Sequence, residues 1–215
     1  MTVQQDRDSI WALVHTERKQ LAQDLADISS DEWHTESLCA GWSVHDVLAH
    51  LLDTAMTTRR SFVWTMIKAR GDFHKANAIG IDRYQHHDPN ETLAAFEQAL
   101  TATNTPPAAP ATRLVEAYVH GEDIRRPLGI RGNYPQVGLH HALEYQLRTR
   151  VSFEGGRERA AGLQLRDSES DVTWGEGPEV TGTAIDLLLA VSGRTVSPTL
   201  FAGPGAPTLV ERASE

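Results

Sequence analysis

Residues 43–70 read SVHDVLAHLLDTAMTTRRSFVWTMIKAR, a stretch whose pattern predicts a helix. Its apolar residues recur at steps of three, four and seven, which is the spacing of one face of an α-helix. Ser43 is a favourable N-cap residue and Gly71 a favourable stop, so we expect one long amphipathic helix that ends near Arg70. Its apolar side consists of Val44, Val47, Leu48, Leu51, Leu52, Ala55, Phe62, Val63, Met66 and Ile67.

Similar helical patterns flank this stretch on both sides. The segment 72–88 has mixed periodicity, and we expect it to be an irregular loop. Four helices joined by one long loop predict a helix bundle over residues 1–130. We expect the four helices at residues 6–28, 43–70, 88–103 and 111–126.

After Gly129 the chain changes to shorter segments separated by turn residues. Helical spacing predicts a helix over residues 138–151 and another over residues 183–194. Alternating apolar and polar residues predict short strands within 161–170, 171–177, 179–182 and 198–212. The sequence therefore predicts an α+β protein, with a helix bundle at residues 1–130 and a small α/β domain at residues 131–215.

The composition restricts the partners of this chain. Among 215 residues, 29 Asp and Glu against 20 Lys and Arg give a formal net charge of -9. This balance argues against nucleic acid as the main partner, because phosphate binding needs a basic face. The first residues do not resemble a signal peptide, and no stretch has the ~18 apolar residues of a membrane span, so we expect a cytoplasmic protein. The lone Cys39 excludes an internal disulfide, and we expect a small packed hydrophobe there rather than a nucleophile.

Glu116 and His120 lie four residues apart in the predicted helix over residues 111–126. At this spacing the two side chains project from the same face, one turn apart, and can bind one ion. A helix supplies two metal ligands in this way. A Glu and a His on the polar face of a surface helix give the same pattern, so the spacing alone leaves a purely structural role open.

His50 lies off the apolar face of the helix expected over residues 43–70, on a flank that it shares with Asp46 and Thr54. This flank is either solvated or the wall of a polar cavity between helices. If it faces Glu116 and His120, two imidazoles and one carboxylate form the ligand set of a catalytic metal site with an open position.

Three segments, SLCAGWSVHDVLAHLL, EAYVHGEDIRRPLG and DVTWGEGPEVTGTAIDLLLAVSGR, together resemble the mycothiol-dependent maleylpyruvate isomerase family. They occur in the family's order over nearly the whole chain. The resemblance implies a DinB-like four-helix bundle followed by a small C-terminal α/β domain related to sterol-carrier-like folds. It also implies a divalent metal, usually zinc, held by a histidine on the second helix and a Glu-x3-His pair on the last bundle helix. In this sequence these positions are His50, Glu116 and His120.

The resemblance extends to two further residues. Asp123 stands at an acidic position that follows the last ligand, where a carboxylate orients the ligating histidine or the substrate. An ion pair with Arg125 or Arg126 is the alternative for Asp123. Arg194 corresponds to a functional arginine of the C-terminal domain, although a basic residue near the end of a helix also stabilises the helix dipole without any substrate.

The resemblance implies an enzyme that binds mycothiol and a small-molecule substrate, as a monomer or a small homo-oligomer. A divalent cation deprotonates a thiol that coordinates it, and the resulting thiolate suits two reactions. One is cis-trans isomerisation of a maleylpyruvate-type substrate, and the other is thiol S-transfer. Two other classes stay open: a metal-dependent hydrolase that needs no thiol, and a binding or stress-response module without catalysis.

Overall fold

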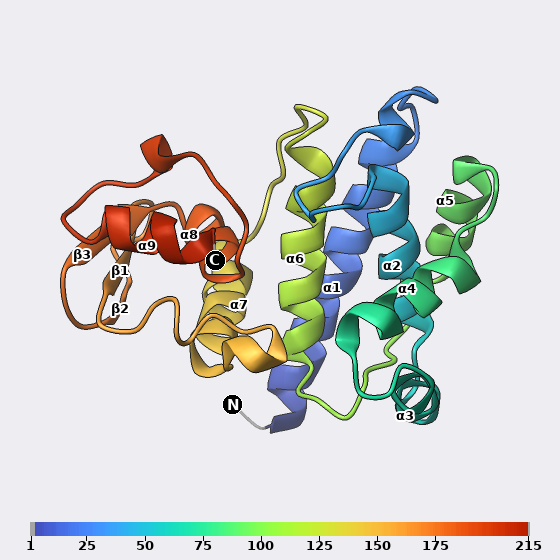
Figure 1. Cartoon of the computed structure of the whole chain (residues 1–215), viewed down its shortest axis with the longest axis horizontal. Coiled ribbons are helices and arrows are strands. Elements are labelled where there is room, and N and C mark those ends of the chain that lie inside the picture. Colours follow the sequence, from blue (N-terminus) through green and yellow to red (C-terminus); the bar gives the residue numbers. More distant parts are fainter. Residues whose placement is uncertain (1–2, 215) are drawn as a thin grey trace. The chain divides into compact units, whose positions relative to one another are not determined.

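The computed structural model describes residues 3–214, and the chain divides into two compact units between Gly132 and Asn133. Helices make up most of the first unit, and the second unit combines helices with a three-stranded sheet (Figure 1). The prediction of an α+β protein is confirmed. No helix of the described residues is long and apolar enough to cross a membrane.

The first unit is built around α2, which packs against three other helices, α4, α5 and α6. Helix α1 packs against α5 and α6, so the apolar faces of these helices meet in one core. The helices of this unit are α1 (Val3–Leu25), α2 (Val44–Met56), α3 (Arg59–Lys68), α4 (Phe73–Tyr84), α5 (Pro89–Gln98) and α6 (Ala111–Arg125), with a 3-10 turn at Glu32–His34.

The prediction of one helix over residues 43–70 is wrong, because the chain leaves helical geometry at Thr57 and Thr58. The Thr58 hydroxyl accepts a hydrogen bond from the backbone N–H of Ser61, and the Ser61 side chain bonds the backbone N–H of Thr58. This capping box starts a new helix, α3. Apolar spacing continues across the break, which is why the pattern does not reveal it.

The prediction of a loop over residues 72–88 is also wrong, because this segment contains α4. The Asp72 side chain caps the helix by accepting a hydrogen bond from the backbone N–H of Lys75 at 3.1 Å. Helix α4 buries mainly small residues against α2, so its apolar periodicity is weak. At Gly80 the two helices approach so closely that a Cβ atom would clash with the carboxylate of Asp53.

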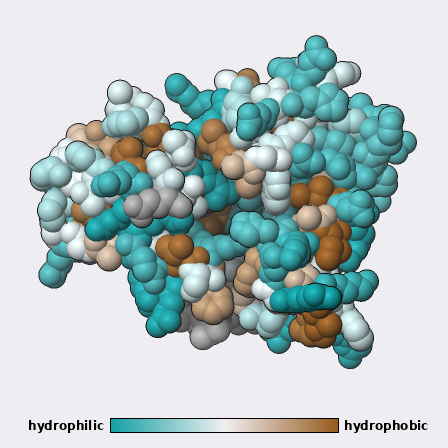
Figure 2. Space-filling model, viewed as in Figure 1, coloured by the Kyte–Doolittle hydropathy of each residue, from teal (hydrophilic) through white to brown (hydrophobic). Residues whose placement is uncertain are grey.

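Helix α3 has no buried residue and leaves an apolar strip exposed to solvent. Its side chains Val63, Trp64 and Ile67 are 50%, 66% and 61% exposed. Figure 2 shows apolar surface gathered over this helix. Among its neighbours, α3 packs mainly against α4, so its attachment to the bundle is limited.

A buried ion group joins α6 to α1. The Arg125 guanidinium, which is fully buried, donates hydrogen bonds to the carboxylates of Glu17 and Asp24. Two acidic side chains therefore share one cation in a largely buried region. Burial raises the pKa of Glu17 to about 7, although the charge of Arg125 acts in the opposite direction.

The second unit contains a small mixed sheet with the strand order β2-β1-β3. Strand β1 pairs antiparallel with β2 and parallel with β3. Helix α8 packs against β1, α7 and α9. The elements are α7 (Gln136–Arg148), β1 (Gln164–Asp167), β2 (Thr173–Gly175), β3 (Glu179–Gly182), α8 (Ala184–Val191) and α9 (Ala206–Ala213), with 3-10 turns at Val151–Phe153 and Pro198–Leu200.

The strand expected within residues 198–212 is a wrong prediction. An isolated bridge between Ala202 and Thr181 and a hydrogen bond from the Gly205 backbone N–H to the Glu179 carbonyl oxygen join this segment to β3, but they do not form a strand. Pro207 lies in the first turn of α9, where proline is tolerated because the turn needs no intrahelical N–H donor. The apolar residues that follow Pro207 lie on one face of this short helix.

Candidate functional site

Helices α2 and α6 bring His50 and His120 into contact. Their ring centroids are 4.8 Å apart, and the rings meet edge to face. Thr54, one turn after His50, contacts Glu116, one turn before His120, so the two helices run antiparallel. The start of α2 is fixed by a capping box in which Ser43 and Asp46 bond each other's backbone N–H groups, and this sets the rotation of His50.

Trp42 covers the histidine pair, although no feature of the sequence pattern singled it out. Its ring centroid lies 5.1 Å from that of His50 and 6.4 Å from that of His120. The loop before it is tied to α6 by a hydrogen bond from the Leu38 backbone N–H to the Asp123 carbonyl oxygen. A cavity of about 260 Å³ lies beside Trp42 and is lined by Gly41, Trp42, Asp46, Ala78, Ile81, Asp82 and Gln85.

Asp123 orients the His120 ring. Its Oδ2 atom lies 2.8 Å from the Nδ1 atom of His120, and the carboxylate is fully buried. Because a carboxylate accepts hydrogen bonds, we assign the ring proton to Nδ1, which leaves the Nε2 lone pair to bind a ligand. Arg125 pairs with carboxylates of α1, and Arg126 pairs with Glu122.

Glu116 has partners on both of its carboxylate oxygens. The Thr54 hydroxyl donates to Oε1 at 2.6 Å, and the Arg113 guanidinium lies 2.8 Å from Oε2. Both side chains of the ion pair are about nine-tenths buried, with exposed fractions of 9% for Arg113 and 10% for Glu116. Within residues 3–214, no group of three or more His, Cys, Asp and Glu side chains is arranged to hold a metal ion.

The donor types at this position still suit a divalent cation. Two imidazoles in contact and a carboxylate on the adjacent turn of the same helix form a ligand set that zinc prefers, and Asp123 provides the usual outer partner of a ligating histidine. The structure thus brings His50 and His120 together, with Glu116 one helical turn away. To become the third ligand, Glu116 has to exchange its contacts with Arg113 and Thr54.

Arg194 lies in the second unit, three residues after the end of α8. Its guanidinium donates a hydrogen bond to the Ser192 carbonyl oxygen at 3.0 Å, near the end of that helix. This contact fits the structural role of a basic residue at a helix C-terminus. A catalytic role for Arg194 stays a prediction.

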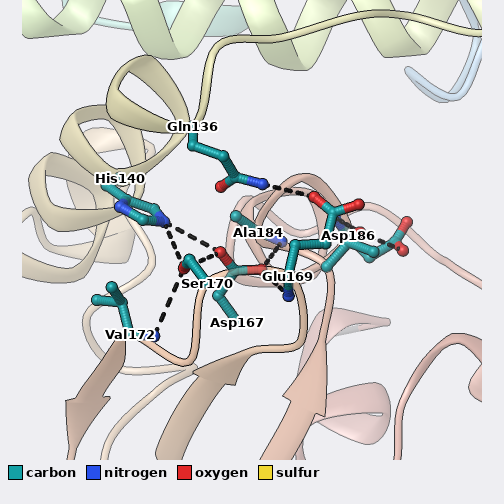
Figure 3. A network of polar contacts seen from close by, with 9 residues as sticks. Gln136, His140, Asp167, Glu169, Ser170, Val172, Ala184 and Asp186 are labelled. Atoms are coloured by element: carbon teal, nitrogen blue, oxygen red, sulfur yellow. Dashed lines mark hydrogen bonds and ion pairs between the residues drawn. The ribbon is translucent and has the colours of Figure 1, made fainter.

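A second polar cluster, in the second unit, surrounds the fully buried carboxylate of Asp167 (Figure 3). Its Oδ2 atom accepts hydrogen bonds from Ser170 Oγ and contacts His140 Nε2 at 3.0 Å, while Oδ1 accepts from the backbone N–H groups of Glu169 and Ala184. Ser170 and Asp167 meet the same ring nitrogen. A catalytic Ser-His-Asp triad needs them on opposite nitrogens, so we interpret this cluster as structural.

The Asp167 cluster predicts a pH-dependent stability of the second unit. Burial opposes ionisation, but hydrogen bonds from Ser170, His140 and the Glu169 backbone outweigh it and hold the pKa of Asp167 below its usual value. Because the folded pKa is the lower one, this stabilisation is present above about pH 4 and is lost as the pH falls through the folded pKa. We expect Asp167→Asn to destabilise the unit by about 2–4 kcal/mol at pH 7, as measured by urea unfolding.

Glu169→Gln is the matched control for this change, because the Glu169 carboxylate lies in the same turn but is exposed. We expect that control to change stability by less than about 0.5 kcal/mol. The difference between Asp167→Asn and the wild type should shrink at pH 3.5. Equal differences at pH 7 and pH 3.5 would contradict the assigned role of the carboxylate.

Part of the chain is similar to a known protein family. Residues 14–109, just under half of the chain, match the mycothiol maleylpyruvate isomerase N-terminal domain. The matched residues end shortly before α6, which carries Glu116 and His120. No curated protein matches the sequence.

The fold is similar to two crystal structures of a mycothiol-dependent maleylpyruvate isomerase. One of them is a histidine-to-alanine mutant, which matches with a TM-score of 0.66 at 16% sequence identity. The other matches with a TM-score of 0.65 at 17% identity. Each alignment covers 96% of this chain and 97% of the other chain. Together with the domain match, these similarities confirm the resemblance drawn from the sequence.

Proposed function

Residues 14–109 match the mycothiol maleylpyruvate isomerase N-terminal domain, and from this we propose that the protein is a metal-dependent enzyme that uses mycothiol as its thiol. The observation that supports the proposal most directly is the contact between His50 and His120, with the Asp123 carboxylate behind the second ring. We propose His50, Glu116 and His120 as the residues that hold a divalent cation, with zinc as the first candidate.

The cation would supply one chemical property, a lowered pKa of a thiol bound to it. The residues of the chain supply orientation and exclusion of water. Asp123 keeps the proton on Nδ1 of His120, so that Nε2 always presents its lone pair. Trp42 packs on both imidazoles and shields them from solvent on one side. The cavity beside Trp42 is where we expect the remainder of the thiol ligand to approach.

We propose cis-trans isomerisation of a maleylpyruvate-type substrate as the reaction, in keeping with the enzyme whose fold the chain shares. Thiol S-transfer uses the same residues and is the second possibility within this class. A hydrolase that needs no thiol, and a binding module without turnover, are alternatives that the following experiment separates from it.

The test uses the full chain loaded with zinc and mixed with mycothiol, with glutathione or with no thiol. We expect mycothiol at about 100 times its dissociation constant to stabilise the protein by roughly 2.7 kcal/mol, seen as a rise in Tm, and glutathione to have a smaller effect. Conversion of maleylpyruvate should then require mycothiol. Stoichiometric zinc without any response to mycothiol would favour a hydrolase, and a chain that binds neither would be a non-enzymatic module.

A further inference from the structure

The Glu116 carboxylate lies between two sets of partners on α6. Arg113 is three residues before it and His120 is four residues after it, and both spacings place side chains on the same helical face. Glu116 can therefore contact Arg113 or the histidine pair. In the structure it contacts Arg113 and Thr54, through one oxygen each.

Further contacts strengthen this arrangement. Arg113 also donates a hydrogen bond to the Thr54 carbonyl oxygen at 3.4 Å, so Arg113, Thr54 and Glu116 form a closed group across α2 and α6. All three residues are buried or nearly so, with Thr54 only 9% exposed. Water therefore competes weakly with these hydrogen bonds, and exchanging them has a cost.

A second buried guanidinium increases the positive charge around Glu116. Arg18 on α1 is 3% exposed and donates to the Ala102 carbonyl oxygen at 2.9 Å. Burial lowers the pKa of Arg18 to about 10; the charge of Glu116 acts against this decrease, and that of Arg113 adds to it. On the α2 side, Asp53 pairs with Arg83. Asp53 also interacts electrostatically with Arg113. Glu116 is the carboxylate that contacts Arg113 directly, and it acts on Arg18 at longer range.

We infer that Arg113, assisted by Thr54, is a positioning residue that occupies the Glu116 carboxylate oxygens, competes with a divalent cation for them and so weakens the binding of that cation. The inference rests on the proposed function, because it takes His50, Glu116 and His120 as the ligands. Two effects act in the same direction. Cation binding has to break the Glu116 contacts with Arg113 and Thr54, and it brings positive charge toward two buried guanidiniums.

The experiment measures zinc affinity of the full metal-free chain by competition with a colorimetric chelator. Arg113→Met removes the charge and keeps a side chain of similar length, and we expect zinc to bind about tenfold more tightly. Thr54→Val removes the hydroxyl that contacts Glu116 and the Leu51 carbonyl oxygen, with almost no change of shape, and we expect about threefold tighter binding. Because Arg113→Met can affect folding, Tm is measured for each variant, and Thr54→Val decides the question if Arg113→Met is unfolded.

Arg126→Met is the matched control, because it removes another Arg-Glu pair, at the C-cap of the same helix. We expect its zinc affinity to stay within twofold of the wild type. Adding Glu116→Gln to Arg113→Met should remove the gain, since the released carboxylate is the group that binds zinc. Unchanged or weaker zinc binding by both Arg113→Met and Thr54→Val would overturn the inference.

The zinc affinities of the histidine variants distinguish a failure of the proposed function from a failure of this inference. If the wild type binds zinc and His50→Ala and His120→Ala bind it as tightly, the ligand assignment is wrong whatever Arg113→Met does. If zinc binding depends on both histidines but not on Arg113 or Thr54, only the positioning role is wrong. Absence of zinc binding in the wild type and in all variants would overturn both.

Discussion

His120→Ala is expected to lower the zinc affinity of the purified chain more than about a hundredfold. Loss of an outer partner of a ligating histidine typically costs about ten- to a hundredfold in metal affinity, so loss of the ligand itself should cost more. In this protein the His120 ring contacts His50 at a centroid distance of 4.8 Å, and alanine removes the whole donor. Zinc content after dialysis and the dissociation constant measured by chelator competition test the prediction.

Asp123→Asn should also lower the zinc affinity, but by less than His120→Ala. Asparagine keeps the shape of the side chain but loses the charge that fixes the proton on His120 Nδ1, so we expect a loss of about ten- to a hundredfold. His87→Ala removes an exposed histidine and serves as the control, with no expected change. If the order of affinities does not follow wild type, Asp123→Asn, His120→Ala, the assignment of these roles is wrong.

Arg125→Met should reduce the free energy of unfolding of the first unit by about 3–5 kcal/mol at neutral pH, because it leaves the buried Glu17 and the partly buried Asp24 without their cation. Arg125 is fully buried, and its guanidinium bonds Glu17 on one side and Asp24 on the other. Urea unfolding monitored by circular dichroism measures this loss. Arg148→Met is the control: Arg148 is 80% exposed in its pair with Glu144, and we expect less than about 0.5 kcal/mol.

Glu17, in the same ion group, makes the stability of the first unit depend on pH. Burial raises the pKa of Glu17 from 4.5 to about 7 in the folded state. A raised acid pKa means that the folded chain binds the proton more tightly, so this contribution to stability is present below about pH 4.5 and is lost as the pH rises to 7. Glu17→Gln should flatten the decrease between these pH values. An unchanged slope in Glu17→Gln would show that another group causes it.

Local signals predicted most helices of the first unit, and they failed where a cap interrupts a continuous apolar pattern. Ser43 and Asp88 each cap a helix, as typical N-cap residues do. Thr58 does the same in the middle of the predicted helix over residues 43–70, where its neighbours continue the apolar spacing. Asp72 was an available signal for α4, but that helix packs through small residues and its periodicity is weak.

Some features of the candidate site depend on residues close together in the sequence, and others depend on how distant segments pack. The spacing of Glu116 and His120 is a property of one helix and can be predicted from the sequence. The contact of His50 with His120 depends on how two helices pack, which the sequence pattern does not specify and the resemblance supplied. The contacts of Glu116 with Thr54 and Arg113 depend on side-chain choices within the folded unit, and neither the pattern nor the resemblance predicted them.

The residues that match the isomerase domain stop before α6, so the match depends on α1 to α5 and not on the helix with Glu116 and His120. Chains grouped by this match can therefore share a fold while differing in two of the three proposed metal ligands. We expect a survey of such chains to separate into subgroups by the pair at the positions of Glu116 and His120, and by whether an arginine precedes the glutamate by three residues. Differences in catalytic chemistry would then be found in α6, which lies outside the residues 14–109 that match the family.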